Sequence, residues 1–285
     1  MGSLLGMTTQ TTSVPYLDLN DGNRIPHLGF GVFKVPPEET AEAVAHALRT
    51  GYRLIDTAAA YENEAGVLDG LQTSGLDRGE VFITTKLQNS DQGGERARRA
   101  FKRSLDRLGG DYIDLYLIHW PIPSKDLYVD TWETLCALKE EGRLRSIGVS
   151  NFQPAHLERI IDATGVVPVI NQIELHPRLV QPELRRYHAE HDIVTQAWAP
   201  LGRGELLDEP VIEEIASAHD RTAAQVVLRW HVQLGNVAIP KSVTPSRIEE
   251  NLQVFNFELS DEEMRRLSEL DRGERTGPDP DTFGG

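Results

Sequence analysis

Ile113-Asp114-Leu115-Tyr116-Leu117-Ile118-His119 is an apolar run that ends in one polar residue able to do chemistry. Two runs of the same kind precede it, Arg53-Leu54-Ile55-Asp56 and Val81-Phe82-Ile83-Thr84-Thr85-Lys86. Each run predicts a buried strand, and stretches with helical spacing separate the three. If these strands are consecutive and parallel, the carboxylate, the amine and the imidazole that end them lie at one edge of one sheet.

The rest of the chain continues this alternation. The predicted strands cover residues 28–33, 54–57, 81–86, 113–119, 146–149, 169–173, 193–198 and 237–240. Their continuous apolar character suits parallel strands that are covered on both faces. Between the first two, Ala41, Val44, Ala45 and Leu48 recur with the period of a helix. Eight strand–helix units in an α/β chain of this length predict a (β/α)8 TIM barrel, whose active site lies at the C-terminal ends of the strands.

A doubly wound sheet is the competing fold. That fold usually carries a G-x-G-x-x-G nucleotide motif after its first strand, and here Gly29-Phe30-Gly31-Val32-Phe33-Lys34 lacks the third glycine. The barrel is therefore preferred. Before it, Asn20-Asp21-Gly22-Asn23 lies between two short apolar segments and predicts an N-terminal β-hairpin.

Three positions are predicted to start helices. Pro154 suits the first turn of a helix. Ser246-Arg247-Ile248-Glu249 and Ser260-Asp261-Glu262-Glu263 both fit the capping-box pattern, in which a serine and a glutamate three residues later satisfy the first amides of a helix.

Size and composition limit the class of protein. The 285 residues are expected to form one barrel domain, 1–285, with a tag remnant and flexible N-terminus at 1–15 and an irregular tail at 272–285. A net charge of −15 disfavours nucleic acid and anionic membrane surfaces as partners. No apolar run approaches the ~20 residues of a membrane span. Cys136 is the one cysteine of the sequence, so no internal disulfide forms; a cytoplasmic monomer without a metal site is expected.

Tyr61 completes a proton-transfer site in outline. It follows Asp56 by five residues and is expected in the loop above the edge where the strands end. A carboxylate, an amine, an imidazole and a phenol together have the composition of a general acid–base site. A free tyrosine has a pKa of about 10, and Lys86, kept charged by Asp56, is expected to lower the pKa of Tyr61. His119 is expected to orient the substrate oxygen.

Each of these side chains also has an ordinary structural role. An aspartate at a strand end often caps a helix, a lone lysine is usually solvated, and a histidine in an apolar run is often a hydrogen-bonded core residue. Tyr61 alone could be a packing residue. The convergence of four such residues on neighbouring strands favours catalysis. A barrel lyase that uses Lys86 as a Schiff-base nucleophile is the competing chemistry.

Motifs in chain order resemble those of the aldo-keto reductase superfamily over nearly the whole sequence. They are Leu19-Asn20-Asp21-Gly22-Asn23, Asp56-Thr57-Ala58-Ala59-Ala60-Tyr61, Thr85-Lys86, Leu117-Ile118-His119-Trp120-Pro121, Ser146-Ile147-Gly148-Val149-Ser150-Asn151-Phe152, Asn171-Gln172-Ile173-Glu174-Leu175-His176-Pro177 and Ile239-Pro240-Lys241-Ser242. The sequence is most similar to the bacterial 2,5-diketo-D-gluconate reductase branch, through Gly31-Val32-Phe33-Lys34-Val35-Pro36 and Ala197-Trp198-Ala199-Pro200-Leu201-Gly202.

The resemblance implies an NADPH-dependent carbonyl reductase. Hydride passes from the nicotinamide to a carbonyl carbon, Tyr61 is the general acid, Lys86 and Asp56 tune it, and His119 orients the carbonyl. The cofactor supplies the reducing chemistry and the protein supplies position and electrostatics. The same fold also serves non-catalytic NADPH-binding regulatory or structural subunits, which is the alternative function.

The resemblance also implies a set of cofactor contacts along the later strands. The nicotinamide end is assigned to Ser150, Asn151, Gln172 and Trp198, with Pro200 and Leu201 beyond them, and the adenosine end to Lys241, Ser242, Val243, Arg247, Glu250 and Asn251. Ser150 and Asn151 could instead cap the helix near Pro154, and Trp198 could fill the core. Arginine offers a two-pronged fork for phosphate, so Arg247 and Lys241 favour NADPH over NADH.

Substrate choice is expected to depend on loops. Phe33 and Trp120, together with Trp198, are expected to form an aromatic wall of the pocket. Gln88 stands where the diketo-gluconate reductase branch tends to carry tryptophan, which makes one side of the pocket more polar. The expected substrates are therefore small aldehydes, dicarbonyls and keto sugars in general.

Overall fold

Parallel strands in consecutive order form the central sheet of the computed structural model, which describes residues 13–284. Within that range the sheet has eight strands: β3 (Phe30–Gly31), β4 (Leu54–Asp56), β5 (Phe82–Leu87), β6 (Ile113–Ile118), β7 (Leu144–Ser150), β8 (Ile170–Glu174), β9 (Val194–Trp198) and β10 (Val237–Ala238). The predicted strands are confirmed, although β3 and β10 are shorter than predicted.

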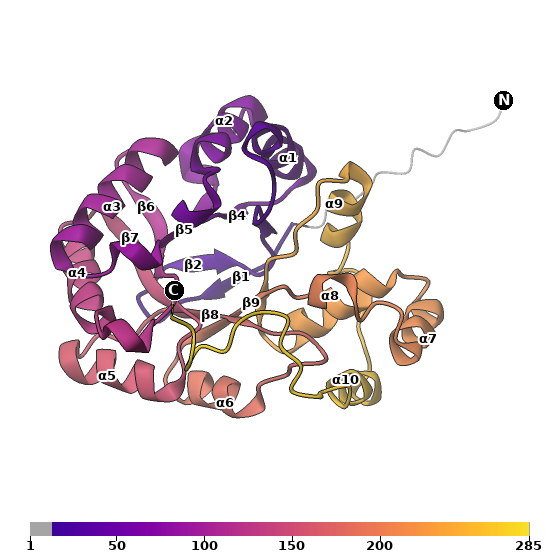
Figure 1. Ribbon diagram of the computed structural model, residues 1–285. Coiled ribbons are helices and arrows are strands. Elements are labelled where there is room, and N and C mark those ends of the chain that lie inside the picture. The colour runs from indigo at the N-terminus through magenta and orange to yellow at the C-terminus, as the bar shows by residue number, and fades with distance from the viewer. Residues whose placement is uncertain (1–12, 285) are drawn as a thin grey trace.

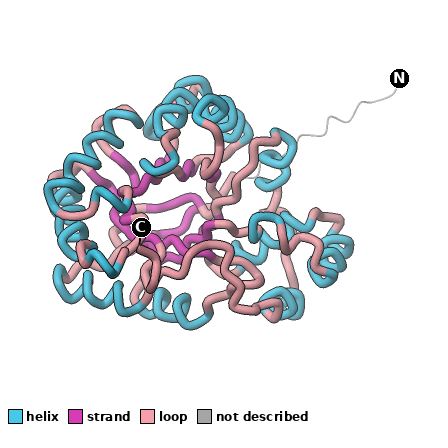
Figure 2. The backbone as a smooth tube through the Cα atoms, in the orientation of Figure 1, coloured by secondary structure: helices cyan, strands magenta, loops and turns pink. Residues whose placement is uncertain are grey.

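Backbone hydrogen bonds join the two outer strands of this sheet. The amide of Gly29 donates to the carbonyl of Ala238 at 2.9 Å, and the amide of Gly31 donates to that of Pro240 at 3.0 Å. A Cβ atom on Gly31 would lie 3.1 Å from the Ile239 carbonyl oxygen, so the absence of a side chain permits this close approach. The sheet thus closes into the predicted barrel, with helices around the strands (Figure 2).

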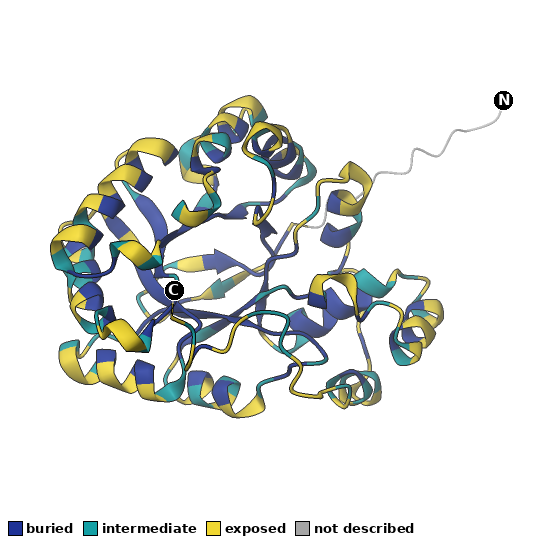
Figure 3. Cartoon of the chain, viewed as in Figure 1, coloured by how far each residue is buried: buried dark blue, intermediate teal, exposed yellow. Residues whose placement is uncertain are grey.

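The helices lie on the outside of the barrel (Figure 1). They are α1 (Pro37–Thr50), α2 (Glu64–Ser74), α3 (Gly94–Leu108), α4 (Tyr128–Glu140), α5 (Pro154–Thr164), α6 (Pro182–Glu190), α7 (Pro210–His219), α8 (Ala223–Gln233), α9 (Pro245–Leu252) and α10 (Asp261–Ser268). Figure 3 shows their inner faces buried and their outer faces exposed, as the helical period predicts. In α1, the predicted core positions Val44, Ala45 and Leu48 are buried.

The predicted helix starts are confirmed at two positions and wrong at one. α5 begins at Pro154, and Gln153 takes the cap position, so Ser150 and Asn151 do not cap this helix. Ser260 caps α10, with the reciprocal bond to Glu263 in place. The capping box at Ser246 is wrong, because α9 already begins at Pro245, whose fixed φ suits the first helical position.

The predicted N-terminal hairpin is present and covers the amino end of the barrel. It consists of β1 (Tyr16–Asp18) and β2 (Arg24–Pro26), which pair antiparallel. Its buried residues Leu19 and Ile25 pack with the barrel's interior side chains, among them Leu54 and Leu115. The opposite end, where the strands terminate, is therefore the open end of the barrel and is called the mouth below.

The two ends of the chain differ from one another. The tag remnant proposed for the first residues lies outside the described part of the chain, but Val14 is buried and the Pro15 carbonyl accepts a hydrogen bond from the His27 amide at 2.8 Å. From residue 272 to 284 the chain forms neither helix nor strand, as predicted. That segment returns over the mouth, and Figure 1 shows it in yellow within the ring of helices.

Candidate active site

The strand-end residues of the sequence prediction meet at the mouth. Asp56 ends β4, Lys86 lies near the end of the adjacent β5, and His119 directly follows the next strand, β6. Tyr61 ends the short 3-10 helix η1 (Ala59–Tyr61) that follows β4. The structure therefore brings together the four predicted catalytic residues, called the catalytic group below.

Lys86 holds the centre of this group. Its side chain is 1% exposed, and its ammonium lies 2.6 Å from Asp56 Oδ1, 2.9 Å from the Thr57 carbonyl oxygen and 3.3 Å from the Tyr61 hydroxyl. Burial alone lowers the pKa of Lys86, but Asp56 and Tyr61 raise it by more, so the amine is charged at neutral pH. A permanently charged lysine is a poor Schiff-base nucleophile, which disfavours the lyase alternative.

The pKa of Tyr61 departs from the sequence prediction. Lys86 does lower it, but burial raises it by more and the charge of Asp56 adds to that, so the net pKa lies above the ordinary value. The expected lowering of the pKa is therefore wrong for this structure, because desolvation of the phenolate outweighs one neighbouring ammonium. Tyr61 is a protonated phenol at neutral pH, the form that a proton donor requires.

His119 lies against the edge of the Tyr61 ring, with 5.8 Å between ring centroids. Burial and the nearby charge of Lys86 lower the pKa of His119 to about 3. Its imidazole is therefore neutral at physiological pH and retains one N–H donor. A neutral ring at this position can hydrogen-bond a substrate oxygen without becoming a competing acid.

A hydrogen-bonded network links the catalytic group to the predicted nicotinamide residues. Gln172 Nε2 donates to Asp56 Oδ2 at 2.7 Å and to Gln196 Oε1 at 2.9 Å. Asn151 Nδ2 donates to the His119 carbonyl at 3.0 Å. The side-chain nitrogens of Gln172 and Asn151 are thus engaged within the protein, and within residues 13–284 the Oε1 of Gln172 accepts no hydrogen bond.

Ser150, Asn151 and Trp198 form the next part of this network. Ser150 Oγ donates to the Gln172 carbonyl at 2.8 Å, and Trp198 Nε1 donates to Asn151 Oδ1 at 2.8 Å. Asn151 has a φ of 63°, a left-handed conformation that asparagine tolerates better than most residues. Trp198 is half-buried, so it is not fully enclosed in the core.

The predicted adenosine residues follow β10, in the loop before α9 and in α9 itself. Lys241 and Arg247 are exposed, and within residues 13–284 no carboxylate forms an ion pair with either. The acids of this segment lie near other groups: Glu249 Oε1 lies 3.1 Å from His46 Nε2, and Glu250 accepts a hydrogen bond from Thr222 Oγ1 at 2.8 Å. These two cations are therefore available to an anionic ligand.

The remaining predicted contacts surround those cations. Ser242 Oγ accepts from the Thr244 amide at 3.1 Å, just before the start of α9, and Val243 is exposed. Asn251 is buried on α9. Just after β9, Pro200 is buried, its carbonyl lies 3.0 Å from His231 Nε2, and Leu201 is half-buried. Lys241, Ser242, Arg247 and Asn251 are called the adenosine grip below.

The predicted substrate residues separate into distinct environments. Phe33 is 48% exposed and its ring lies 5.0 Å from that of Tyr61, so it forms a free apolar surface beside the proposed acid. Trp120 is buried and packs against Phe283 of the C-terminal segment, with the two rings tilted and 4.6 Å between their centroids. Gln88 is exposed just after β5. Trp120 thus has an aromatic neighbour, Phe283, that the sequence prediction omitted.

Glu174 is a second residue that the sequence prediction did not assign. It ends β8, is buried, and accepts hydrogen bonds from Thr276 and Gly277 of the C-terminal segment. The available signal was a carboxylate inside the apolar run Ile173-Glu174-Leu175, because a buried acid requires partners.

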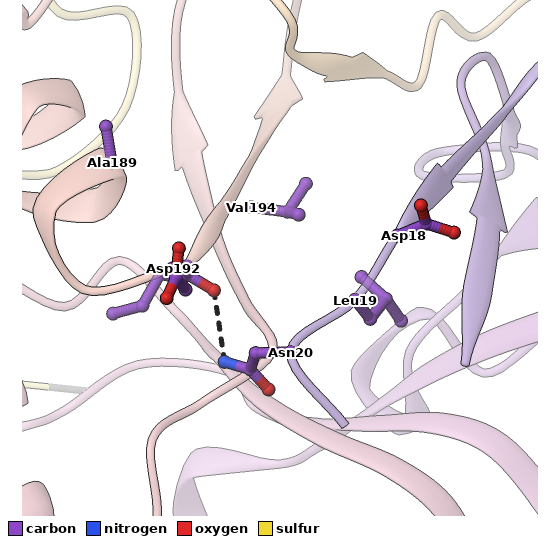
Figure 4. Close-up of a pocket in the computed structure, with 7 residues that line it drawn as sticks. Asp18, Leu19, Asn20, Ala189, Asp192 and Val194 are labelled. Atoms are coloured by element: carbon purple, nitrogen blue, oxygen red, sulfur yellow. Dashed lines mark hydrogen bonds between the residues drawn. The ribbon is translucent and has the colours of Figure 1, made fainter. Parts of the chain in front are cut away.

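A cavity of about 420 Å³ lies at the other end of the barrel, beside the hairpin (Figure 4). It is lined by Asp18, Leu19, Asn20, Ala189, Asp192, Ile193 and Val194. Asn20 closes one side by donating to the Asp192 carbonyl at 3.1 Å. This cavity is at the amino ends of the strands, where barrel residues serve stability rather than catalysis.

Within residues 13–284, no group of three or more histidine, cysteine, aspartate or glutamate side chains is arranged to hold a metal ion. Within the same range, every helix is too short or too polar to span a bilayer.

Comparisons with known proteins agree with the geometry. The model of the Aldo/keto reductase family matches residues 27–272. An aldo-keto reductase of Mycobacterium sp. strain KMS is 57% identical over 269 residues, covering 94% of this chain and 98% of the relative. Methylglyoxal reductase DkgA of Salmonella typhimurium is 53% identical over 269 residues, covering 94% and 97%.

A solved structure has the same fold as this chain. The crystal structure of a Gox0644 mutant in complex with NADPH superposes with a TM-score of 0.92 at 50% identity, covering 95% of this chain and 99% of that one. The family resemblance read from the sequence motifs and the predicted barrel are both confirmed.

Proposed function

Because this chain belongs to the aldo-keto reductase family, we propose that it uses NADPH to reduce aldehyde and ketone carbonyls to alcohols, with Tyr61 as the general acid. The observation that carries the proposal is the placement of the Tyr61 hydroxyl 3.3 Å from Lys86 Nζ, with that ammonium held 2.6 Å from Asp56. When bound, NADPH supplies the hydride that reaches the carbonyl carbon.

The catalytic group supplies the proton and the position. The carbonyl oxygen, as it gains negative charge, takes the proton of Tyr61, and the phenolate that remains lies beside the charged Lys86. The neutral His119 donates a hydrogen bond to the same oxygen and fixes its direction. A proton donor placed in this way contributes about 10²–10⁴-fold to a rate.

The cofactor follows from the family and from the open cations. A relative of the same fold is solved in complex with NADPH. In this chain Ser150, Asn151 and the Oε1 of Gln172 are assigned to the carboxamide, and Trp198 to the nicotinamide face. Lys241 and Arg247, without carboxylate partners in the described part of the chain, are assigned to the 2′-phosphate, which favours NADPH over NADH.

The proposed substrates are small aldehydes, dicarbonyls and keto sugars. Relatives more than half identical to this chain are named methylglyoxal reductases, which supports dicarbonyls within that range. The exposed Phe33 offers an apolar surface beside Tyr61, while Gln88 gives the loop after β5 a polar side chain.

A panel of carbonyls tests this proposal. The purified protein is mixed with NADPH and with methylglyoxal, phenylglyoxal or a keto sugar in turn. It is expected to oxidise NADPH over many turnovers, and the substrates are ranked by kcat/KM. Tight NADPH binding with no turnover across the panel would instead favour the non-catalytic binding subunit.

A further inference from the structure

The C-terminal segment is fastened across the mouth at several points. The amides of Arg272 and Glu274 donate to the Arg178 carbonyl at 3.2 and 3.1 Å. At the far end of the segment, Phe283 packs on Trp120. Between these two attachments the chain passes over β8 and β9, and there it meets the carboxylate of Glu174.

Both oxygens of the buried Glu174 carboxylate have hydrogen-bond partners. Its Oε1 accepts from the Thr276 amide and the Thr276 hydroxyl, both at 2.6 Å, and lies 3.1 Å from His176 Nε2. Its Oε2 accepts from the Gly277 amide at 3.0 Å. Burial raises the pKa of Glu174, but these hydrogen bonds lower it by more, so the carboxylate is ionised at neutral pH. A buried charge is tolerated only with such compensation.

Gly277 brings the segment directly against Trp198. A Cβ atom on Gly277 would lie 2.5 Å from Trp198 Cη2, a distance that no real contact permits. Glu174 and Trp198 are register partners on β8 and β9. The indole is thus held on one side by its hydrogen bond to Asn151 and on another by the backbone of the tail.

We propose that Glu174 is a positioning residue: it clasps Thr276 and Gly277, and through Gly277 it keeps Trp198 in place to receive the nicotinamide. This inference rests on the proposed function, because it takes Trp198 as a cofactor contact. Glu174 itself touches neither cofactor nor substrate. Its effect on the reaction passes through the tail.

The hydrogen bonds of Glu174 with Thr276 and Gly277 are called the clasp below. Three variants separate the effect of the clasp from the effect of the position of Trp198. Glu174→Gln keeps the volume but places an amide donor against backbone N–H groups. Thr276→Val removes one hydroxyl donor and leaves the amide contacts. Gly277→Ala leaves every donor of the clasp in place but forces Trp198 or the tail to move. Glu183→Gln, at an exposed position in the first turn of α6, is the matched control.

The full-length proteins are compared by three measurements. These are the NADPH affinity, the separate changes in KM and kcat, and the rate of trypsin cleavage after Arg275, directly before the clasp. Glu174→Gln is expected to weaken NADPH binding about tenfold and to speed that cleavage at least tenfold, while kcat at saturating NADPH stays within about threefold. Thr276→Val is expected to move both readouts in the same direction but less. Gly277→Ala is expected to weaken NADPH binding, and Glu183→Gln to change nothing.

An unchanged NADPH affinity in Glu174→Gln and Gly277→Ala would overturn the proposal, even if the tail became easier to cleave, because the clasp would then serve stability alone. If Glu174→Gln does not fold, Thr276→Val and Gly277→Ala decide by the same readouts. Failure of the proposed function is distinguishable, since the parent protein would then bind NADPH without reducing any carbonyl.

Discussion

The catalytic group and the adenosine grip lie at the same end of the barrel but are built in opposite ways. In the catalytic group, Lys86 is buried and already paired with Asp56 at 2.6 Å. In the adenosine grip, Lys241 and Arg247 are exposed and lack carboxylate partners in the described part of the chain. In the proposed function the chemistry is therefore preorganised, because its charges are fixed before any ligand arrives. The proposed cofactor contacts instead rely on charges that the ligand itself must pair.

The first way to test this difference between the two groups is to remove the proton donor. Tyr61→Phe is expected to keep the fold and the NADPH affinity and to lower kcat about 10²–10⁴-fold, because only the hydroxyl is lost. Steady-state kinetics and an NADPH titration check this. The control is Tyr187→Phe, in which the deleted hydroxyl belongs to a half-buried ring on α6. Full activity in Tyr61→Phe would remove the general-acid assignment.

The second way is to break the buried pair. Lys86→Met leaves the Asp56 carboxylate buried without its counter-ion, so the free energy of unfolding is expected to fall by about 3–5 kcal/mol. The double change Asp56→Leu with Lys86→Met is expected to recover part of that loss, although it stays inactive. Denaturant unfolding measures both. Lys102→Met, at an exposed position on α3, is the control. Equal stability of Lys86→Met and the parent protein would show that the pair is not preorganised.

The third way is to weaken the adenosine grip. Arg247→Ala is expected to weaken NADPH binding by about 1.5–3 kcal/mol, roughly ten- to a hundredfold, since a charged hydrogen bond is lost. NADH binding is expected to change much less, because NADH has no 2′-phosphate. Titrations with both cofactors check this, with the exposed Arg186→Ala on α6 as control. Equal losses for both cofactors would reject the phosphate contact.

The smallest expected effect is on the pH profile. Because the pKa of Tyr61 lies above its ordinary value of about 10, the acid form persists as pH rises, and reduction is expected to decline only above about pH 10. Because the pKa of His119 is about 3, its ring does not gain a proton between pH 5 and 9. The profile of kcat is therefore expected to be flat over that range. A descending limb centred near pH 7 would contradict these assignments.

Much of the fold and the centre of the site could be predicted from the sequence. Apolar runs ending in Asp56, Lys86 and His119 predicted parallel strands, and strand order then determined which side chains meet. The start of α9 was predicted wrongly because Pro245 outweighs Ser246, a competition between two local signals. The pKa of Tyr61 could not be predicted, because it depends on how deeply the phenol is buried.

The position of the C-terminal segment could not be predicted from the sequence. Its polar, proline- and glycine-rich composition predicted irregular structure correctly, but composition says nothing about where an irregular segment lies. The contacts of Thr276, Gly277 and Phe283 with Glu174, Trp198 and Trp120 join residues far apart in the chain. Only the folded barrel brings their partners to one place.

The single-turnover rate of hydride transfer at saturating NADPH tests the division between the catalytic group and the adenosine grip most directly. Measured side by side with methylglyoxal, Tyr61→Phe is expected to slow this step at least about a hundredfold. Arg247→Ala is expected to leave it within about threefold once the cofactor is bound. An equal slowing in the two variants, or a normal rate in Tyr61→Phe, would contradict the account.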